Sequence, residues 1–330
     1  MKKVLVAGAA GFIGRNLCAK LLSTGARVYG IDNLSSGRRE RISELETLDN
    51  FSFFQRDIAQ GLIEFEADEI YNLACVASPT LYQKEPIHTL NTCYNGSQNL
   101  LELARRNNAR ILLASTSEIY GEPYESPQKE TSFGNVNPIG VRSCYDEGKR
   151  VAEALFSAYR REYDVDIRIA RIFNTYGIGM NSNDGRVVSN FIRQALNSEP
   201  ITIYGSGKQT RSFCYVDDTV NGLIALMSSE ETLPVNIGNP EEITVETLAN
   251  KILRLTGSTS RVIFQELPED DPTHRQPDIT RAIDLLNWRP TVSLEEGLMR
   301  TIKWARKRTM SYSLKTTHSK NSSTLNDIPQ

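Results

Sequence analysis

Short runs of apolar residues alternate with longer segments over the first half of the chain, and in the longer segments the apolar positions recur about every 3.6 residues. The short runs predict buried strands, whereas the periodic segments predict amphipathic helices. This alternation is typical of a parallel sheet with helices on both faces. The expected strands are residues 4–7, 27–32, 51–57, 69–74, 110–114 and 166–171, and the expected helices include one that ends at Leu22, one over 89–107 and one over 145–163.

The alternation ends after Arg171, where a segment rich in Gly and Asn predicts a loop. Isolated helices and short strands follow, one of the helices opened by a cap at Thr244. An acidic segment with prolines predicts another loop, and a tail rich in Ser, Thr and Lys predicts disorder. The expected helices are 186–197, 217–227, 244–255 and 294–308, the strands are 201–204 and 235–238, the loops are 174–185 and 268–277, and the tail is 309–330.

These elements predict an α/β protein with a doubly wound parallel sheet of the Rossmann type and a smaller C-terminal substrate-binding lobe. We expect the sheet domain to cover 1–172, with 213–238 returning to it, and the lobe to comprise 173–212 and 239–308. Open sheets of this type bind ligands at the carboxyl ends of their strands. That edge is therefore where chemistry is expected.

The charge balance narrows the classes of partner. The 330 residues contain 38 Lys and Arg and 40 Asp and Glu, a net charge of −2, which argues against a protein whose main ligand is nucleic acid or an anionic membrane. The sequence lacks a run of about 18 apolar residues, so no membrane-spanning helix is expected. Five cysteines are scattered without a CxxC motif and three histidines lie far apart, which predicts reduced thiols in a cytoplasmic protein and no metal site.

A glycine-rich turn follows the first expected strand and opens a helix. Gly8, Gly11 and Gly14 allow a tight turn, a close approach of the backbone to a pyrophosphate and close helix–strand packing, and the helix N-terminus supplies N–H groups for the phosphates. Asp32 ends the second strand, where its carboxylate can accept hydrogen bonds from both ribose hydroxyls and repel a 2′-phosphate. The pattern predicts NAD rather than NADP, with Asp57 placed to meet the adenine edge or, alternatively, to cap a helix.

Tyr145 and Lys149 lie four residues apart on an expected helix and therefore share one face. An ammonium beside a phenol stabilises the phenolate and lowers the pKa of the tyrosine toward the working pH. Thr116 follows the fifth strand at the carboxyl edge of the sheet, and Glu118 comes two residues later. Each of these residues alone also fits an ordinary structural role, and only their combination points to a function.

In combination, the glycine turn, Asp32, Thr116 and the YxxxK pair resemble the extended short-chain dehydrogenase/reductase family, whose members act on nucleotide-sugars. Longer strings are similar to the UDP-glucuronate decarboxylases, also called UDP-xylose synthases, within that family. The resemblance covers about residues 1–305, and the string around Tyr145 is the most discriminating. The strings are ASTSEIYGEP at 114–123, NPIGVRSCYDEGKRVAE at 137–153, RIFNTYG at 171–177, NDGRVVSNFI at 183–192, YGSGKQTRSFCYVDD at 204–218 and DDPTHRQPDI at 270–279.

The resemblance implies decarboxylation of UDP-glucuronate to UDP-xylose through a 4-keto intermediate, with bound NAD as the cofactor. Tyr145 would accept the proton of the C4 hydroxyl, Thr116 would hydrogen-bond the same oxygen, and Lys149 would hold the nicotinamide ribose. Glu118 and Arg275 match positions beside C5 and the carboxylate, and their individual roles stay open. A solvated surface turn is the other interpretation of the loop around Arg275.

The resemblance also assigns binding residues and a homodimer in which the helices around 89–107 and 145–163 face the partner chain. Asn174 and Arg211 match residues that hold the diphosphate, for which a guanidinium fork is well suited. Tyr204 matches the uridine region, although a packed strand aromatic is equally compatible. The NAD set is Gly8, Gly11, Phe12, Ile13, Gly14, Asp32, Asn33, Asp57, Ile58, Leu73, Ala74, Ala114, Tyr145 and Lys149, and the nucleotide-sugar set is Asn174, Arg186, Val188, Tyr204, Gln209, Arg211 and Arg275.

Two stretches depart from the decarboxylase pattern. After the fourth strand, family members read close to HLASPASP, where this chain reads NLACVASP. In the next helix the family often carries a lysine near the substrate and an asparagine two residues on, and these positions hold Asn91 and Cys93. A cation beside a carboxylated sugar would help select glucuronate over a neutral sugar, so the class of nucleotide-sugar enzyme is better supported than the particular sugar.

The departures leave other functions open: a 4,6-dehydratase, a 4-epimerase, or a decarboxylase that stops at the 4-keto pentose. Dehydratases usually carry Thr-Asp-Glu where this chain has Thr116, Ser117 and Glu118, and epimerases usually lack the glutamate, so both comparisons favour a decarboxylase. A catalytically silent protein that binds NAD and a partner is the alternative from a different class. The presence of Thr116, Tyr145 and Lys149 argues against it.

Overall fold

The computed structural model describes residues 1–61, 64–182, 184–266 and 274–321, the last fourteen of these as backbone only. Seven parallel strands form the main sheet, in the order β11-β6-β5-β4-β1-β2-β3. The chain reverses its direction of travel across the sheet between β1 and β4, which is where such sheets bind ligands. The strands are β1 (Lys3–Ala7), β2 (Arg27–Asp32), β3 (Phe51–Gln55), β4 (Glu69–Asn72), β5 (Arg110–Thr116), β6 (Ile167–Ile172) and β11 (Val235–Ile237).

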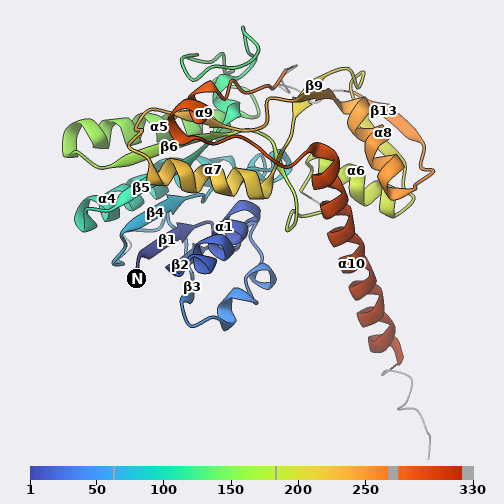
Figure 1. The fold of residues 1–330 in the computed structure, drawn as a ribbon, viewed down its shortest axis with the longest axis horizontal. Coiled ribbons are helices and arrows are strands. Elements are labelled where there is room, and N and C mark those ends of the chain that lie inside the picture. The colour runs from blue at the N-terminus through green and yellow to red at the C-terminus, as the bar shows by residue number, and fades with distance from the viewer. Residues whose placement is uncertain (62–63, 183, 267–273, 322–330) are drawn as a thin grey trace, which may run out of the picture.

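Helices cover both faces of this sheet (Figure 1). Helices α1 (Phe12–Ser23) and α7 (Val216–Ser228) pack together on one face, and α4 (Ser97–Asn107) and α5 (Ser143–Tyr163) pack together on the other. Strand β1 shows how the sequence divides its side chains, because Val4 and Val6 enter the first core and Leu5 and Ala7 enter the second. This architecture confirms the predicted doubly wound α/β fold.

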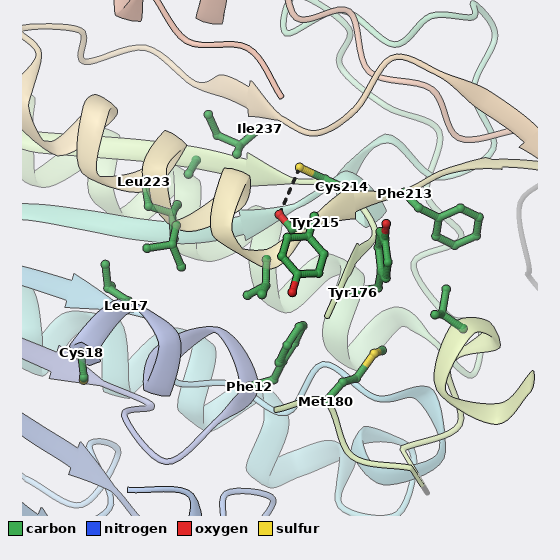
Figure 2. Close-up of a cluster of buried hydrophobic side chains, with 14 of the residues drawn as sticks. Phe12, Leu17, Cys18, Tyr176, Met180, Phe213, Cys214, Tyr215, Leu223 and Ile237 are labelled. Carbon is green, nitrogen blue, oxygen red and sulfur yellow. Dashed lines mark hydrogen bonds between the residues drawn. The ribbon is translucent and has the colours of Figure 1, made fainter. Parts of the chain in front are cut away.

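The core on the α1 side extends beyond the sheet into the C-terminal part of the chain. Figure 2 shows Phe12 and Leu17 of α1 in one cluster with Leu223 of α7, and with Tyr176 and Met180. The carboxyl-terminal part is therefore joined to the sheet by a continuous apolar core. No helix within the described residues is long and apolar enough to cross a membrane.

Helices α6, α8 and α10 pack against one another beside the sheet (Figure 1). Three pairs of short strands accompany them, and β11 and α7 return to the large sheet from this half of the chain. The predicted domain boundaries remain a prediction. The elements are α6 (Val187–Leu196), α8 (Val245–Thr256), α9 (Thr280–Leu286), α10 (Leu294–Asn321), and the pairs β7 (Thr175–Tyr176) with β10 (Cys214–Tyr215), β8 (Ile201–Tyr204) with β13 (Val262–Gln265), and β9 (Thr210–Ser212) with β12 (Glu242–Thr244).

Several element bounds differ from those expected. The helix predicted over 89–107 begins earlier, as α3 (Pro86–Asn91), and continues through a π-helical turn, η3 (Thr92–Gly96), into α4. The last helix continues to Asn321, whereas it was predicted to end at residue 308 and to be followed by a disordered tail over 309–330. Residues 309–321 contain neither Pro nor Gly, so nothing there stops a helix. Residues 322–330 lie outside the described residues. The predicted cap is confirmed, because the Thr244 hydroxyl accepts a hydrogen bond from the Thr247 N–H at 3.0 Å.

Candidate active site

The turn between β1 and α1 can be built only with glycine. Gly8 has a φ of +83°, and a Cβ there would lie 2.7 Å from the carbonyl oxygen of Leu73, just beyond β4. A Cβ at Gly14 would lie 2.0 Å from the carbonyl oxygen of Gly8. The turn thus sits directly against the next strand, with Gly11 as the N-cap of α1. The first N–H groups of α1 face this turn, which makes it a ready site for phosphate.

A pocket lies at the carboxyl edge of the sheet, between this turn and the segments that follow β2, β3 and β4. Eight residues predicted to bind NAD line it, whereas Phe12, Ile13 and Gly14 form the first turn of α1 outside the lining. The lining residues from the prediction are Gly8, Gly11, Asp32, Asn33, Asp57, Ile58, Leu73 and Ala74, and those not predicted are Ile31, Ser35, Ser36, Arg56, Cys75, Val76, His88 and Thr92.

Asp32 occupies the end of β2 and is buried beside the turn. Its carboxylate accepts hydrogen bonds from the Ala10 N–H at 3.0 Å and the Leu34 N–H at 2.8 Å. Burial raises the pKa of this carboxyl, and the two backbone donors oppose the shift. The carboxylate is therefore fixed in orientation by the backbone at the place where a ribose would lie.

Asp57 is held by three donors on the other wall of the pocket. The His88 Nε2 lies 2.8 Å and the Asn33 Nδ2 3.1 Å from one carboxylate oxygen, and the Ala59 N–H lies 2.8 Å from the other. Burial acts to raise the pKa of Asp57, but these hydrogen bonds hold it below its ordinary value. Asp57 thus caps its own turn and lines the pocket at the same time. The sequence did not indicate His88, which lies 31 residues away along the chain.

Tyr145 and Lys149 lie together near the start of α5, as their spacing predicts. Tyr145 is 6% exposed, and its ring stacks on that of Tyr82 with centroids 5.0 Å apart. The Lys149 Nζ lies 5.9 Å from the Tyr145 ring centroid and donates to the carbonyl oxygen of Ala114 at 2.9 Å. The end of β5 and the face of α5 are joined by this contact, which brings Ala114, Tyr145 and Lys149 into one corner.

The pKa of Tyr145 differs from the expectation. Burial raises it well above its usual range, the nearby Cys75 sulfur adds to the effect, and a hydrogen bond with Thr116 opposes it. The predicted lowering by Lys149 is therefore outweighed, because burial penalises the phenolate. The buried phenol of Tyr145 is therefore in its protonated form in this structure.

A buried carboxylate between two guanidinium groups lies next to this corner. The Arg142 Nη2 donates to Glu118 at 2.6 Å, the Arg275 Nη2 donates to the same oxygen, and the Arg275 Nη1 donates to the Ser117 hydroxyl at 2.9 Å. Burial alone would raise the pKa of Glu118, but Arg275 and Arg142 outweigh it and hold the pKa below its ordinary value. Glu118 is therefore an ionised hydrogen-bond acceptor and not a proton donor.

Arg275 is 4% exposed, so the interpretation of its loop as a solvated surface turn is wrong for this residue. Two backbone hydrogen bonds hold the segment around Arg275 near the end of β5. The Gln128 N–H donates to the carbonyl oxygen of Gln276 at 2.7 Å, and the Ser212 N–H donates to the carbonyl oxygen of Arg275 at 3.2 Å. Residues 268–273, the first part of the loop predicted over 268–277, lie outside the described residues.

The predicted nucleotide-sugar residues occupy short elements of the C-terminal half. Arg186 is the N-cap of α6, with its Nε 3.2 Å from Asp184, and Val188 is buried in the first turn. Tyr204 is 43% exposed at the end of β8, so it is not the packed strand aromatic that was the other interpretation. The Gln209 side chain donates a hydrogen bond to the Tyr204 carbonyl oxygen. Asn174 follows β6, and Arg211 is buried in β9, one residue before the Ser212 that pairs with Arg275.

Two residues of this corner were missed from the sequence. Arg142 lies inside the string 137–153 that carries the family resemblance, but nothing in its spacing indicates a partner at Glu118. Tyr82 lies on the short helix α2 (Pro79–Tyr82), and its hydroxyl is buried without a hydrogen-bond partner while its ring covers Tyr145.

The comparisons with known proteins agree with this geometry. Residues 4–238 match the NAD dependent epimerase/dehydratase family, and the chain belongs to that family. Among curated relatives, UDP-glucuronic acid decarboxylase 1 of Xenopus tropicalis is 50% identical over 306 residues, covering 93% of this chain and 72% of the relative. UDP-glucuronic acid decarboxylase 2 of Arabidopsis thaliana is 49% identical over 306 residues, covering 93% and 68%.

Solved structures of more distant relatives share the whole fold. The UDP-glucose 4-epimerase of Thermotoga maritima, crystallised with UDP-glucose, is 29% identical with a TM-score of 0.85, covering 93% of this chain and 99% of that one. The UDP-glucuronic acid 4-epimerase of Bacillus cereus, in complex with UDP-glucuronic acid and NAD, is 28% identical with a TM-score of 0.83, covering 92% and 99%. The likeness thus extends across the sheet and the C-terminal half.

Proposed function

We propose that this chain decarboxylates UDP-glucuronate to UDP-xylose and CO2 through a 4-keto intermediate, with NAD as its cofactor. The observation that carries the proposal is the buried Arg142–Glu118–Arg275 cluster beside Tyr145. The two guanidinium groups face Glu118 and also Asp146, whose carboxylate lies 4.0 Å from the Arg142 Nε, so the charges of this corner are paired. Arg275 nevertheless brings a buried guanidinium to the corner, and a guanidinium fork suits a substrate that bears a carboxylate of its own. The family membership and the names of the half-identical relatives support the same reaction.

The residues around the pocket fit NAD in their chemistry. The glycine turn has no room for a Cβ and brings the N-terminus of α1 to the pocket, while Asp32 and Asp57 place carboxylates at its walls. Asp32 would hold the adenine ribose, Asp57 the adenine edge, and Lys149 the nicotinamide ribose. Bound NAD supplies the reversible two-electron oxidation of the sugar at C4.

Tyr145 and Thr116 would handle the proton of the C4 hydroxyl. The Thr116 hydroxyl acts to lower the pKa of the Tyr145 phenol, so the two groups are neighbours and one sugar oxygen would meet both. Lys149 provides the cation over the Tyr145 ring that offsets part of the cost of a buried phenolate. Stacking on Tyr82 fixes the plane of the ring, which orients the phenol oxygen before the reaction.

Arg275 would act on the C5 carboxylate and on the carbon that it leaves. A ketone at C4 makes the sugar a β-keto acid, so the C5 carboxyl can depart as CO2 and leave an enolate at C4 and C5. The Arg275 guanidinium stabilises negative charge in this corner, and Glu118, which is ionised, holds the guanidinium in place. Asn174 and Arg211 would hold the diphosphate, with Arg186, Val188, Tyr204 and Gln209 around the uridine.

A homodimer in the cytoplasm completes the proposal. Leu90, Tyr94 and Val151 are exposed apolar side chains on α3, η3 and α5, and these three elements pack against one another. This face would pack against the same face of a second copy, because such packing removes the apolar side chains from water. The five cysteines are all free thiols in the structure, in keeping with a reducing compartment.

The deciding experiment is a product assay on a panel of nucleotide-sugars. The purified protein is incubated with NAD and either UDP-glucuronate, UDP-glucose or a dTDP-hexose. Because C4 epimers have the same mass, the products are separated by chromatography against standards and then identified by mass spectrometry. We expect UDP-pentose and CO2 from UDP-glucuronate and no conversion of the neutral sugars. UDP-galacturonate as the main product would instead identify a 4-epimerase, and a dehydrated hexose would identify a 4,6-dehydratase. Conversion of none of them would favour a silent NAD-binding protein.

A further inference from the structure

Two cysteine side chains that are distant in sequence lie in contact beside the candidate active site. The Cys75 Sγ and the Cys93 Sγ are 3.4 Å apart. Cys75 follows β4 in the stretch NLACVASP and lines the nucleotide pocket, whereas Cys93 is 2% exposed within the π-helical turn η3. Both stretches depart from the sequence pattern of the decarboxylases, and the fold brings the two departures together at one point.

The reactivity of Cys75 differs from that of the other four cysteines. The hydrogen bond with Cys75, together with burial, raises the pKa of Cys93 well above its usual range, so Cys93 stays a thiol. A hydrogen bond from Cys93 lowers the pKa of Cys75 to about 7, burial opposes this, and the positive charge of Lys149 adds to the lowering. Burial raises the pKa of the Cys18, Cys144 and Cys214 thiols, and raises that of Cys214 to about 12. Because the thiolate is the nucleophile in thiol oxidation, Cys75 is the thiol that reacts first.

We propose that Cys75 and Cys93 form a peroxide-sensitive thiol pair that closes to a disulfide and reversibly stops turnover at the neighbouring site. The Cys75 thiolate attacks hydrogen peroxide, so that an S–O bond forms, the O–O bond breaks and hydroxide leaves. The Cys93 sulfur then attacks the Cys75 sulfenic acid, which forms the S–S bond and breaks the S–O bond, and the thiol proton leaves with the hydroxyl as water. Two thiols are oxidised, and one peroxide is reduced to two waters.

The geometry explains why closure would stop the reaction. A disulfide bond is about 2.05 Å long, so the two sulfurs must approach by about 1.3 Å from their separation of 3.4 Å. Cys93 is packed so closely on α5 that a Cβ at Gly148 would lie 3.1 Å from its sulfur. The movement is therefore transmitted to the residue before Lys149 or to the pocket wall at Cys75. A displacement of about 1 Å in catalytic groups can lower the rate by about 100-fold.

The test uses the purified full-length protein, treated with hydrogen peroxide, alkylated and digested with trypsin. Cys75 and Cys93 fall in separate tryptic peptides, 57–84 and 85–105, so a disulfide appears as one linked species. We expect these two peptides to be linked, and turnover of UDP-glucuronate to fall at least 10-fold and return with dithiothreitol. Peptide mapping needs no turnover, so it tests the thiol pair even if the proposed function fails.

Two variants separate this pair from other thiols. Cys93→Ser should prevent both the link and the reversible loss of turnover, and Cys75 should then be trapped as a sulfenic acid. Cys144→Ser is the matched control, because Cys144 lies in the same small cluster as Cys75 but donates to the Tyr82 carbonyl oxygen at 3.7 Å; it should leave the link intact. The proposal is overturned if peroxide does not link the two peptides, if the link forms without loss of turnover in an active preparation, or if Cys93→Ser is inhibited and recovers like the wild type.

Discussion

Replacing Arg275 with methionine tests the central cluster most directly. The change keeps the unbranched apolar stem of the side chain and removes the guanidinium that contacts Ser117 and Glu118. If Arg275 faces the sugar carboxylate, C4 oxidation remains possible while decarboxylation and the later steps are blocked. Loss of one preorganised charge stabiliser costs about 100- to 1,000-fold in kcat, or about 2.7–4 kcal/mol. We therefore expect turnover of UDP-glucuronate to fall at least 100-fold.

The same substitution has a calculable effect on stability. Glu118 keeps its 2.6 Å contact with Arg142, so the loss is that of one charged hydrogen-bonding partner, about 1.5–3 kcal/mol. For a chain of 330 residues at about 2.1 cal/mol/K of unfolding entropy per residue, that corresponds to a fall of about 2–4 °C in Tm. The turnover loss therefore exceeds anything that partial unfolding at assay temperature would cause.

Arg281→Met is the matched control for this experiment. Arg281 lies six residues further along, pairs with Glu231 at 2.9 Å and is remote from the Glu118 cluster in the described contacts. Single-turnover absorbance follows the formation of reduced cofactor, and mass spectrometry follows the sugar. Accumulation of reduced cofactor without UDP-xylose in Arg275→Met, with normal turnover in Arg281→Met, is the expected result. Wild-type turnover and product ratio in Arg275→Met would refute a role for Arg275 beyond holding Glu118.

Three further predictions follow from the same corner and from the helical face beside it. Tyr145→Phe should abolish turnover and leave NAD binding, measured by calorimetry, unchanged, because the NAD phosphates bind at the glycine turn and not at the phenol. An equal loss of turnover and of NAD binding would show that Tyr145 has a structural role. Glu118→Gln should make the acid limb of the pH–stability curve less steep. The folded-state pKa of Glu118 lies below the value of about 4.3 for an unfolded chain, so its stabilisation is complete above that pH and is lost as the pH falls through the folded-state value. Urea unfolding between neutral pH and pH about 3 measures this, and an unchanged curve would contradict it. Val151→Glu should convert a homodimer into a monomer by light scattering, and a wild type that is already monomeric at micromolar concentration would remove the dimer from the proposal.

Periodicity in the sequence was enough to locate the main sheet and its helices. Strand β2 was predicted at its observed bounds, and the other strands of the sheet to within a few residues, because each is a continuous apolar run flanked by turns. The paired strands β7, β9, β10, β12 and β13 were missed. They are two to four residues long, and most of them mix polar with apolar residues, so no pattern distinguishes them from loops. The equally short β8 and β11 were predicted.

The sequence by itself determined the chemistry that is local to one turn or one helix. The glycine turn at 8–14 and the pair Tyr145 and Lys149 depend on steric room and on helical spacing, both of which are fixed over a few residues. Tertiary structure alone decided the contacts of Glu118 with Arg142 and Arg275, of Asp57 with His88, and of Cys75 with Cys93. These partners are separated by between 18 and 157 residues along the chain. They come into contact only because whole helices and strands pack together, and the same packing buries Tyr145 and raises its pKa. No local sequence pattern encodes that packing.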